Sequence, residues 1–276
     1  MLGSILEKMK TQKFKLIFTV SVLLILAVVV LIRYSIYQKE GEKNMPYSIS
    51  KVIVISKANK YENNKPNNVE EQPEEENENV EQAVEQTQED NSIWNFDIIQ
   101  TNDIYISIEK KAENVKKDEK IKNITISNIK IEENPVKGTL KAFMPNSLDG
   151  EKYKYTDDYA INENLTYRAA EVSNLQNLQI SNNGGVIGFS IANTQIGKYV
   201  SGDEEEILYN GTLLSKLGIT DADVKSKVSF DLMIELDNGK KYSGKITLNI
   251  TCDGLVEKGT SQQEITDFSD VIFKRN

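Results

Sequence analysis

The residues that most enzymes use for catalysis are scarce in this chain. It contains 276 residues, no histidine and one cysteine, Cys252. Without histidine, Ser-His-Asp and Cys-His catalysis and the common zinc sites lack essential atoms. Cys252 follows an apolar strand pattern and has no basic neighbour to lower its pKa, so we interpret it as a small buried hydrophobic residue. We predict no catalytic residue, no cofactor and no metal site.

Acidic clusters are the one remaining source of metal ligands. They are Asp157 with Asp158, the run 203–206, and Asp221 with Asp223. None has the spacing of a calcium-binding loop with its distant glutamate. Thr220 and Asp223 form a capping-box pattern instead, and the run 203–206 is typical of a solvated loop.

Three tyrosines are the candidate partner-binding residues. Tyr153 and Tyr155 lie two apart, so they share one face of a predicted strand, and Tyr159 follows closely. Exposed aromatic side chains stack on sugar rings or anchor a protein partner. The alternative is that these tyrosines pack within a sheet, as tyrosine commonly does.

The element that must position all these residues is the apolar run 16–32. It has no charge, glycine or proline and lies between Lys15 and Arg33. As a helix it is about 25 Å long, at the short end of what spans a bilayer. It lacks the small-residue pattern of a cleaved signal peptide. The predicted order is a cytoplasmic tail (1–15), a transmembrane signal anchor (16–32), a juxtamembrane neck (33–46) and a β-rich domain (47–276).

Basic residues around this run indicate its orientation. Four lysines precede it, whereas the basic residues after it are interleaved with Glu40 and Glu42. The bias predicts a cytoplasmic N-terminus and an extracytoplasmic domain. The alternative is the inverted topology, with the domain acting as a cytoplasmic-facing regulator.

The net charge of −9 comes from one segment. Residues 62–90 hold eleven acidic residues and one lysine, a charge of −10, which leaves +1 for the rest of the chain. The total charge therefore gives no reason to expect a nucleic-acid partner. The segment lacks aromatic residues, and we predict a disordered acidic insert at 62–91. It is either a stalk or a loop between paired strands; we favour the loop, because closing a long loop costs little.

Alternating apolar residues predict strands along most of the remaining chain. The clearest hairpin covers residues 228–250 and turns at Asn238-Gly239. A second turn is predicted at 182–185. The isoleucine pattern changes parity between Ile126 and Ile129, which predicts a bulge. We also predict that residues 270–275 form a final strand covering a sheet edge.

Helical signal after the anchor is confined to a short stretch that ends at Gly218. The pattern as a whole predicts a mainly β fold: an antiparallel β-sandwich-like extracytoplasmic domain with one short helical crossover, behind a single transmembrane helix.

These features favour a membrane-anchored cell-envelope protein that binds or positions a partner, either an envelope protein or a polymer. The abundance of asparagine, lysine, isoleucine and glutamate is typical of a Gram-positive bacterium with an AT-rich genome. The alternative is an envelope enzyme acting on glycans or peptides through two carboxylates that meet in the fold.

Overall fold

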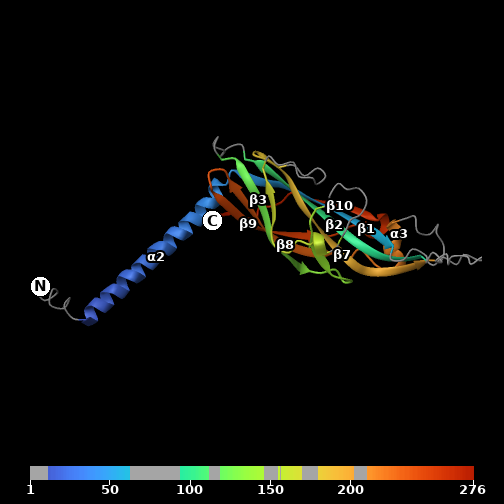
Figure 1. The fold of residues 1–276 in the computed structure, drawn as a ribbon, viewed down its shortest axis with the longest axis horizontal. Coiled ribbons are helices and arrows are strands. Elements are labelled where there is room, and N and C mark those ends of the chain that lie inside the picture. Colours follow the sequence, from blue (N-terminus) through green and yellow to red (C-terminus); the bar gives the residue numbers. More distant parts are fainter. Residues whose placement is uncertain are drawn as a thin grey trace, which may run out of the picture.

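The computed structural model describes residues 12–62, 94–111, 119–145, 155, 157–169, 180–201 and 210–276. A long helix leads into a β-domain built from two antiparallel sheets (Figure 1). The predicted mainly β architecture behind an N-terminal apolar helix is confirmed. The acidic segment and Tyr153 lie outside the described residues.

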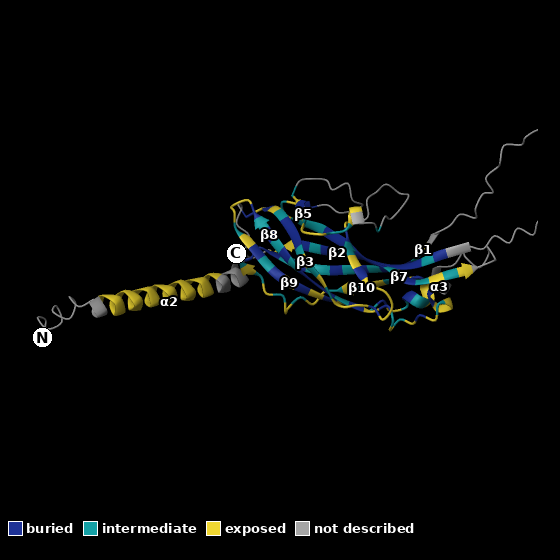
Figure 2. Ribbon diagram, turned by 60° about the horizontal axis from the view of Figure 1, so that its bottom comes forward, coloured by how far each residue is buried: buried dark blue, intermediate teal, exposed yellow. Residues whose placement is uncertain are grey.

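Helix α2 (Gln12–Asn44) is 33 residues long. Its stretch Lys15–Tyr37 is long and apolar enough to cross a membrane, and no other helix among the described residues is. The side chains of this stretch are exposed along its whole length (Figure 2). The predicted neck at 33–46 is helical as far as Asn44, and buried Met45 and Pro46 join the helix directly to the first strand.

The first sheet has the order β10 (Thr260–Ile265), β1 (Tyr47–Glu62), β2 (Trp94–Lys110), β7 (Gly184–Ser201) and β4 (Leu140–Phe143), and β6 (Ile180–Ser181) also pairs with β7. Strands β1 and β2 pair continuously from Tyr47 opposite Lys110 to Glu62 opposite Phe96, apart from a bulge after Ile49. Residues 63–93 therefore connect two neighbouring strands of one sheet, as the loop interpretation expects.

The second sheet has the order β11 (Lys274–Arg275), β9 (Lys241–Ile250), β8 (Ser226–Leu236), β3 (Ile121–Glu133) and β5 (Leu165–Arg168). The β8–β9 hairpin is the predicted one, with one face of each strand buried. In β3 the register shifts between Ser127 and Lys130, and Asn128 has a φ of 52°. This is the bulge that the isoleucine parity predicts.

The two sheets pack face to face through one continuous hydrophobic core. Phe189 on β7 and Phe230 on β8 meet edge to face across this core, with ring centroids 5.2 Å apart. Alternating isoleucine and valine residues on the inward faces supply most of the rest, as expected for a sandwich.

Short helices cap the end of the sandwich that lies far from α2 (Figure 1). Helix α3 (Asn210–Lys216) ends in a left-handed Gly218, with the Ile219 amide donating to the Leu214 carbonyl at 3.0 Å. The amide and the hydroxyl of Thr220 both donate to the Asp223 carboxylate, at 2.8 and 2.7 Å, but this contact closes a turn rather than starting a helix. A second short helix, α4 (Leu255–Lys258), was not predicted.

The predicted C-terminal strand is shorter than residues 270–275. Only β11 pairs with β9, through Lys274 opposite Ser243 and Arg275 opposite Tyr242. Phe268, Val271 and Phe273 pack against the core cluster, whereas the Ile272 side chain is exposed.

We expect the β-domain to unfold in alkaline solution. Burial raises the pKa of Tyr47, Tyr105, Tyr167 and Tyr242 above the ordinary value of 10.0. The folded state keeps these phenols neutral while the unfolded chain would ionise them near pH 10. Their contribution to stability is therefore complete below pH 10 and is lost as the pH rises toward the raised values.

Circular dichroism and phenolate absorbance, recorded together during a pH titration of the full chain in detergent, test this expectation. Part of the phenolate absorbance should appear only at the pH at which the circular dichroism signal of the β-sheets is lost. Complete ionisation of every tyrosine while the β signal is intact would contradict it.

Candidate functional site

An open groove of about 480 Å³ lies between the two sheets, beside the β4 edge of the first and the outer part of β3 in the second. Its lining combines apolar, amide and charged side chains: Asn128, Ile129, Ile131, Leu140, Lys141, Ala142, Ala160, Ile161, Asn162, Glu163 and Asn164. This is the candidate binding groove.

Local backbone geometry creates the groove. Strand β4 has only four residues, so it covers little of the space between the sheets. Residues 159–161 run along its outer edge, with the Met144 amide donating to the Tyr159 carbonyl and the Ile161 amide to the Ala142 carbonyl. The bulge at Asn128 bends β3 on the other side. These three segments hold the groove walls apart.

The groove walls suit a ligand with many hydrogen-bonding groups and some apolar surface. Asn128, Asn162 and Asn164 carry amides, which both donate and accept hydrogen bonds. The Asn128 amide also donates to Asp231 at 2.7 Å, which fixes its orientation. Glu163 is the one carboxylate among the lining residues, so this lining does not provide the carboxylate pair of a glycosidase.

Of the three predicted tyrosines, the structure describes Tyr155 and Tyr159, and Tyr153 lies outside the described residues. Asp157–Tyr159 is a 3-10 turn, not a strand. The Tyr155 ring packs edge-on against Phe143, with centroids 5.1 Å apart, as the packing alternative expects. Tyr159 is 40% exposed and lies next to the groove, beside Met144, which is 48% exposed. Of the tyrosines that the structure describes in this region, Tyr159 therefore fits partner binding best.

Two residues of the acidic clusters, Asp221 and Asp223, make structural hydrogen bonds. The Asp221 carboxylate accepts hydrogen bonds from the Gly254 and Val256 amides, both at 3.1 Å. Asp223 accepts from Thr220. The run 203–206 lies outside the described residues. Within the described ranges, no group of three or more histidine, cysteine, aspartate or glutamate side chains is placed to hold a metal ion.

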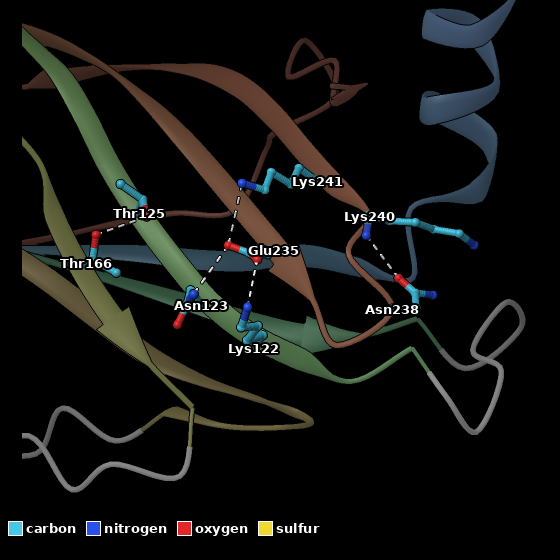
Figure 3. A network of polar contacts seen from close by, with 8 residues as sticks. All are labelled: Lys122, Asn123, Thr125, Thr166, Glu235, Asn238, Lys240 and Lys241. Atoms are coloured by element: carbon cyan, nitrogen blue, oxygen red, sulfur yellow. Dashed lines mark hydrogen bonds and ion pairs between the residues drawn. The ribbon is translucent and has the colours of Figure 1, made fainter.

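Glu235 is the centre of a charged network on the outer face of the second sheet (Figure 3). Its carboxylate lies 3.1 Å from the Lys122 Nζ and accepts a hydrogen bond from the Asn123 amide at 3.3 Å. Hydrogen bonding by Lys122 lowers the pKa of Glu235, so the carboxylate stays ionised. An ionised surface carboxylate cannot act as a general acid, and such exposed pairs stabilise a fold little.

Cys252 lies in a buried polar cluster inside the core. The Gln100 Nε2 donates to the Val224 carbonyl at 3.0 Å and lies 3.2 Å from the Cys252 Sγ. The Ser56 hydroxyl donates to the Asn102 Oδ1 at 2.6 Å. Gln100 and Asn102 come from β2 and Ser56 from β1, so the cluster ties these strands to the segment after β9. Sequence patterns did not reveal this cluster.

We expect the Cys252 thiol to be unreactive in the native protein. Its side chain is 1% exposed, and burial raises its pKa to about 11, so almost no thiolate exists near neutral pH. A neutral thiol reagent at pH 8 should label the cysteine only after the domain is unfolded. Stoichiometric labelling without loss of the circular dichroism signal would contradict this prediction.

Comparisons with known proteins add nothing to this picture, since no family model, curated protein or solved structure matches the chain. The groove must therefore be judged on its own geometry. Sequence reasoning missed it, although the run Ile161-Asn162-Glu163-Asn164 and the bulge at Asn128 are both visible in the sequence.

Proposed function

We propose that this chain is a single-pass membrane protein of the cell envelope whose β-sandwich domain binds a partner in the groove between β3 and β4. The groove itself is the observation that carries the proposal, because its lining combines apolar side chains with three asparagine amides, a mixture that binding sites use. The exposed side chains of Tyr159 and Met144 extend its apolar surface. The partner is an envelope protein or polymer that presents an extended segment with many hydrogen-bonding groups.

The long exposed helix supports the membrane anchor. Its stretch Lys15–Tyr37 has 23 residues, enough to span a hydrocarbon core. An exposed apolar helix of this length would aggregate in water, so a bilayer is the environment that suits it. Residues 16–32 would contact the lipid.

The basic residues before the span favour a cytoplasmic N-terminus and an extracytoplasmic domain. Protease added to cells stripped of their wall should then degrade the chain from residue 47 onward and spare the N-terminal tail. A control with permeabilised cells shows that the tail can be cut. Protection of the domain in intact stripped cells would favour the inverted topology.

Site-specific photocrosslinking in living cells tests the groove. A photoreactive amino acid at Asn162, in the groove, should give a discrete crosslinked product whose mass spectrum identifies a peptide or a glycan. The same amino acid at Asn249 is the matched control, because Asn249 is exposed on β9, which β8 separates from β3 in the second sheet. No product at Asn162, or the same product at both positions, would argue against the groove as the binding site.

A further inference from the structure

We propose that the end of the β-domain next to helix α2 is a docking surface for the anionic headgroups of the membrane that anchors the chain. This inference rests on the membrane anchor of the proposed function but not on the groove. It concerns how the domain sits on the lipid surface.

The junction between helix and domain is short and packed. Met45 and Tyr47 are both 1% exposed, and the Tyr47 hydroxyl donates to the Glu119 and Asn182 carbonyls at 3.0 and 2.8 Å. Helix α2 also contacts β11. Only two residues thus separate the helix from the first core strand, and the domain is held close to the helix end (Figures 1 and 2).

The contact between Arg275 and Tyr37 places this end of the domain near the bilayer surface. The Arg275 guanidinium lies 4.5 Å from the centroid of the Tyr37 ring, a cation–π geometry. Tyr37 is the last residue of the apolar stretch, and tyrosine at that position belongs to the interface between hydrocarbon and headgroups. Arg275 therefore lies at the depth of the headgroups.

Backbone hydrogen bonds gather further basic residues at the same end. The Lys111 amide donates to the Pro46 carbonyl, and the Asp237 amide donates to the Lys120 carbonyl, both at 2.9 Å. The Asn276 amide donates to the Lys241 carbonyl at 2.9 Å. Lys240 pairs with the carboxylate of Glu119, whose carbonyl accepts the hydroxyl of Tyr47 just after the helix. The strand ends, the β8–β9 turn and the C-terminal strand thus bring their lysines together.

This membrane-facing surface is basic. Among the described residues, its eight basic side chains are Lys110, Lys111, Lys120, Lys122, Lys240, Lys241, Lys274 and Arg275, and its four acidic side chains are Glu109, Glu119, Glu235 and Asp237. Glu119 pairs with Lys240, and Glu235 with Lys122 and Lys241. Lys110, Lys111, Lys120 and Lys274 are exposed. The excess positive charge stands out because the chain outside the acidic segment is close to neutral.

Anionic headgroups are the occupant that fits this position. The surface faces the membrane at a distance set by the anchor, within the range where lysine and arginine near an anionic bilayer attract it. Because both leaflets of a membrane can carry anionic lipids, the inference does not depend on the orientation of the chain. A soluble polyanion would have to displace the bilayer to reach the same residues.

The test uses the full chain reconstituted in vesicles of neutral lipid or of neutral lipid with added phosphatidylglycerol. A nitroxide at Asn238→Cys reports on the membrane-facing turn, and one at Ala222→Cys on the distant end; buried Cys252 should stay unlabelled. Collision with a nickel-chelating lipid should be about threefold higher at residue 238 in anionic vesicles than in neutral ones, and this gain should vanish at high salt. Collision at residue 222 should stay low in both.

A charge-reversal triple, Lys111→Glu, Lys120→Glu and Lys274→Glu, should abolish the gain. The matched control reverses three exposed lysines at the far end, Lys57, Lys137 and Lys225, and should keep it. If the charge-reversal variant misfolds, a variant with glutamine at positions 111, 120 and 274 takes its place. It should remove most of the increase in collision that anionic lipid causes. The proposal would be overturned if the collision rate at residue 238 were equal in neutral and anionic vesicles. It would also be overturned if the two triple variants showed the same increase in anionic vesicles. If a carbonate wash removes the chain from the vesicles, the helix does not span the bilayer. That result would overturn both the membrane anchor and the proposed docking surface.

Discussion

Replacing Gly188 by alanine is expected to destabilise the β-domain severely. Gly188 lies in β7 opposite Tyr105 of β2, and its φ is not in the left-handed region. An added Cβ would lie closer than 3.0 Å to the Ile104 carbonyl oxygen, a backbone atom that cannot move aside. The Gly188 carbonyl also accepts the buried Tyr167 hydroxyl. Strands β2 and β7 would have to separate, at a cost of about 4 kcal/mol or more.

Gly239→Ala separates this steric effect from the general cost of replacing glycine. Gly239 has a φ of 79°, and an added Cβ would meet nothing within 4 Å. Only the left-handed backbone then opposes the change, at about 1–2 kcal/mol. Urea unfolding of both full-length variants in detergent, followed by circular dichroism, gives the comparison. If Gly188→Ala loses no more stability than Gly239→Ala, the close approach of β2 and β7 is not as described.

Removing the Phe273 side chain should weaken the C-terminal segment measurably. Phe273 packs over Gly244, where an added Cβ would lie 3.2 Å from the Phe273 Cδ1, and it is partly buried against the core. Phe273→Ala should therefore lower the free energy of unfolding by about 1.5–3 kcal/mol.

The neighbouring residue provides the control. Ile272 is 51% exposed, so Ile272→Ala should change stability by less than about 0.5–1 kcal/mol. Thermal unfolding of the two variants decides the matter. Equal losses would mean that the Ile272 side chain is buried as deeply as that of Phe273, contrary to its observed exposure.

Local patterns in the sequence predicted the elements that local physics determines. The β8–β9 hairpin follows from period-two alternation around Asn238-Gly239, and the β3 bulge from the parity change between Ile126 and Ile129. The left-handed end of α3 follows from Gly218, because glycine alone adopts that conformation without strain. None of these requires knowledge of distant residues.

Features that depend on distant residues could not be predicted. Nothing in residues 260–265 indicates that they pair with β1, and the groove needs β3, β4 and the segment 160–164 to meet. Spacing two apart implies a shared face only in a strand, and Tyr159 lies in the 3-10 turn Asp157–Tyr159, so its place beside the groove could not be read from the spacing. The length of α2 beyond residue 32 was missed because its polar part has no apolar periodicity.

The pairing of β1 with β10 also determines when the domain can fold during synthesis. Strand β1 emerges first, and β2 can pair with one of its edges soon afterwards. Its other edge needs residues 260–265, which are synthesised roughly 150 residues after β2 ends. At about 5–20 residues per second, an edge of alternating isoleucine and valine waits about 8–30 seconds for its partner. Pairing of β1 with β2 and closure of the first sheet by β10 are thus separate events, and chaperones have that interval in which to protect the exposed strand.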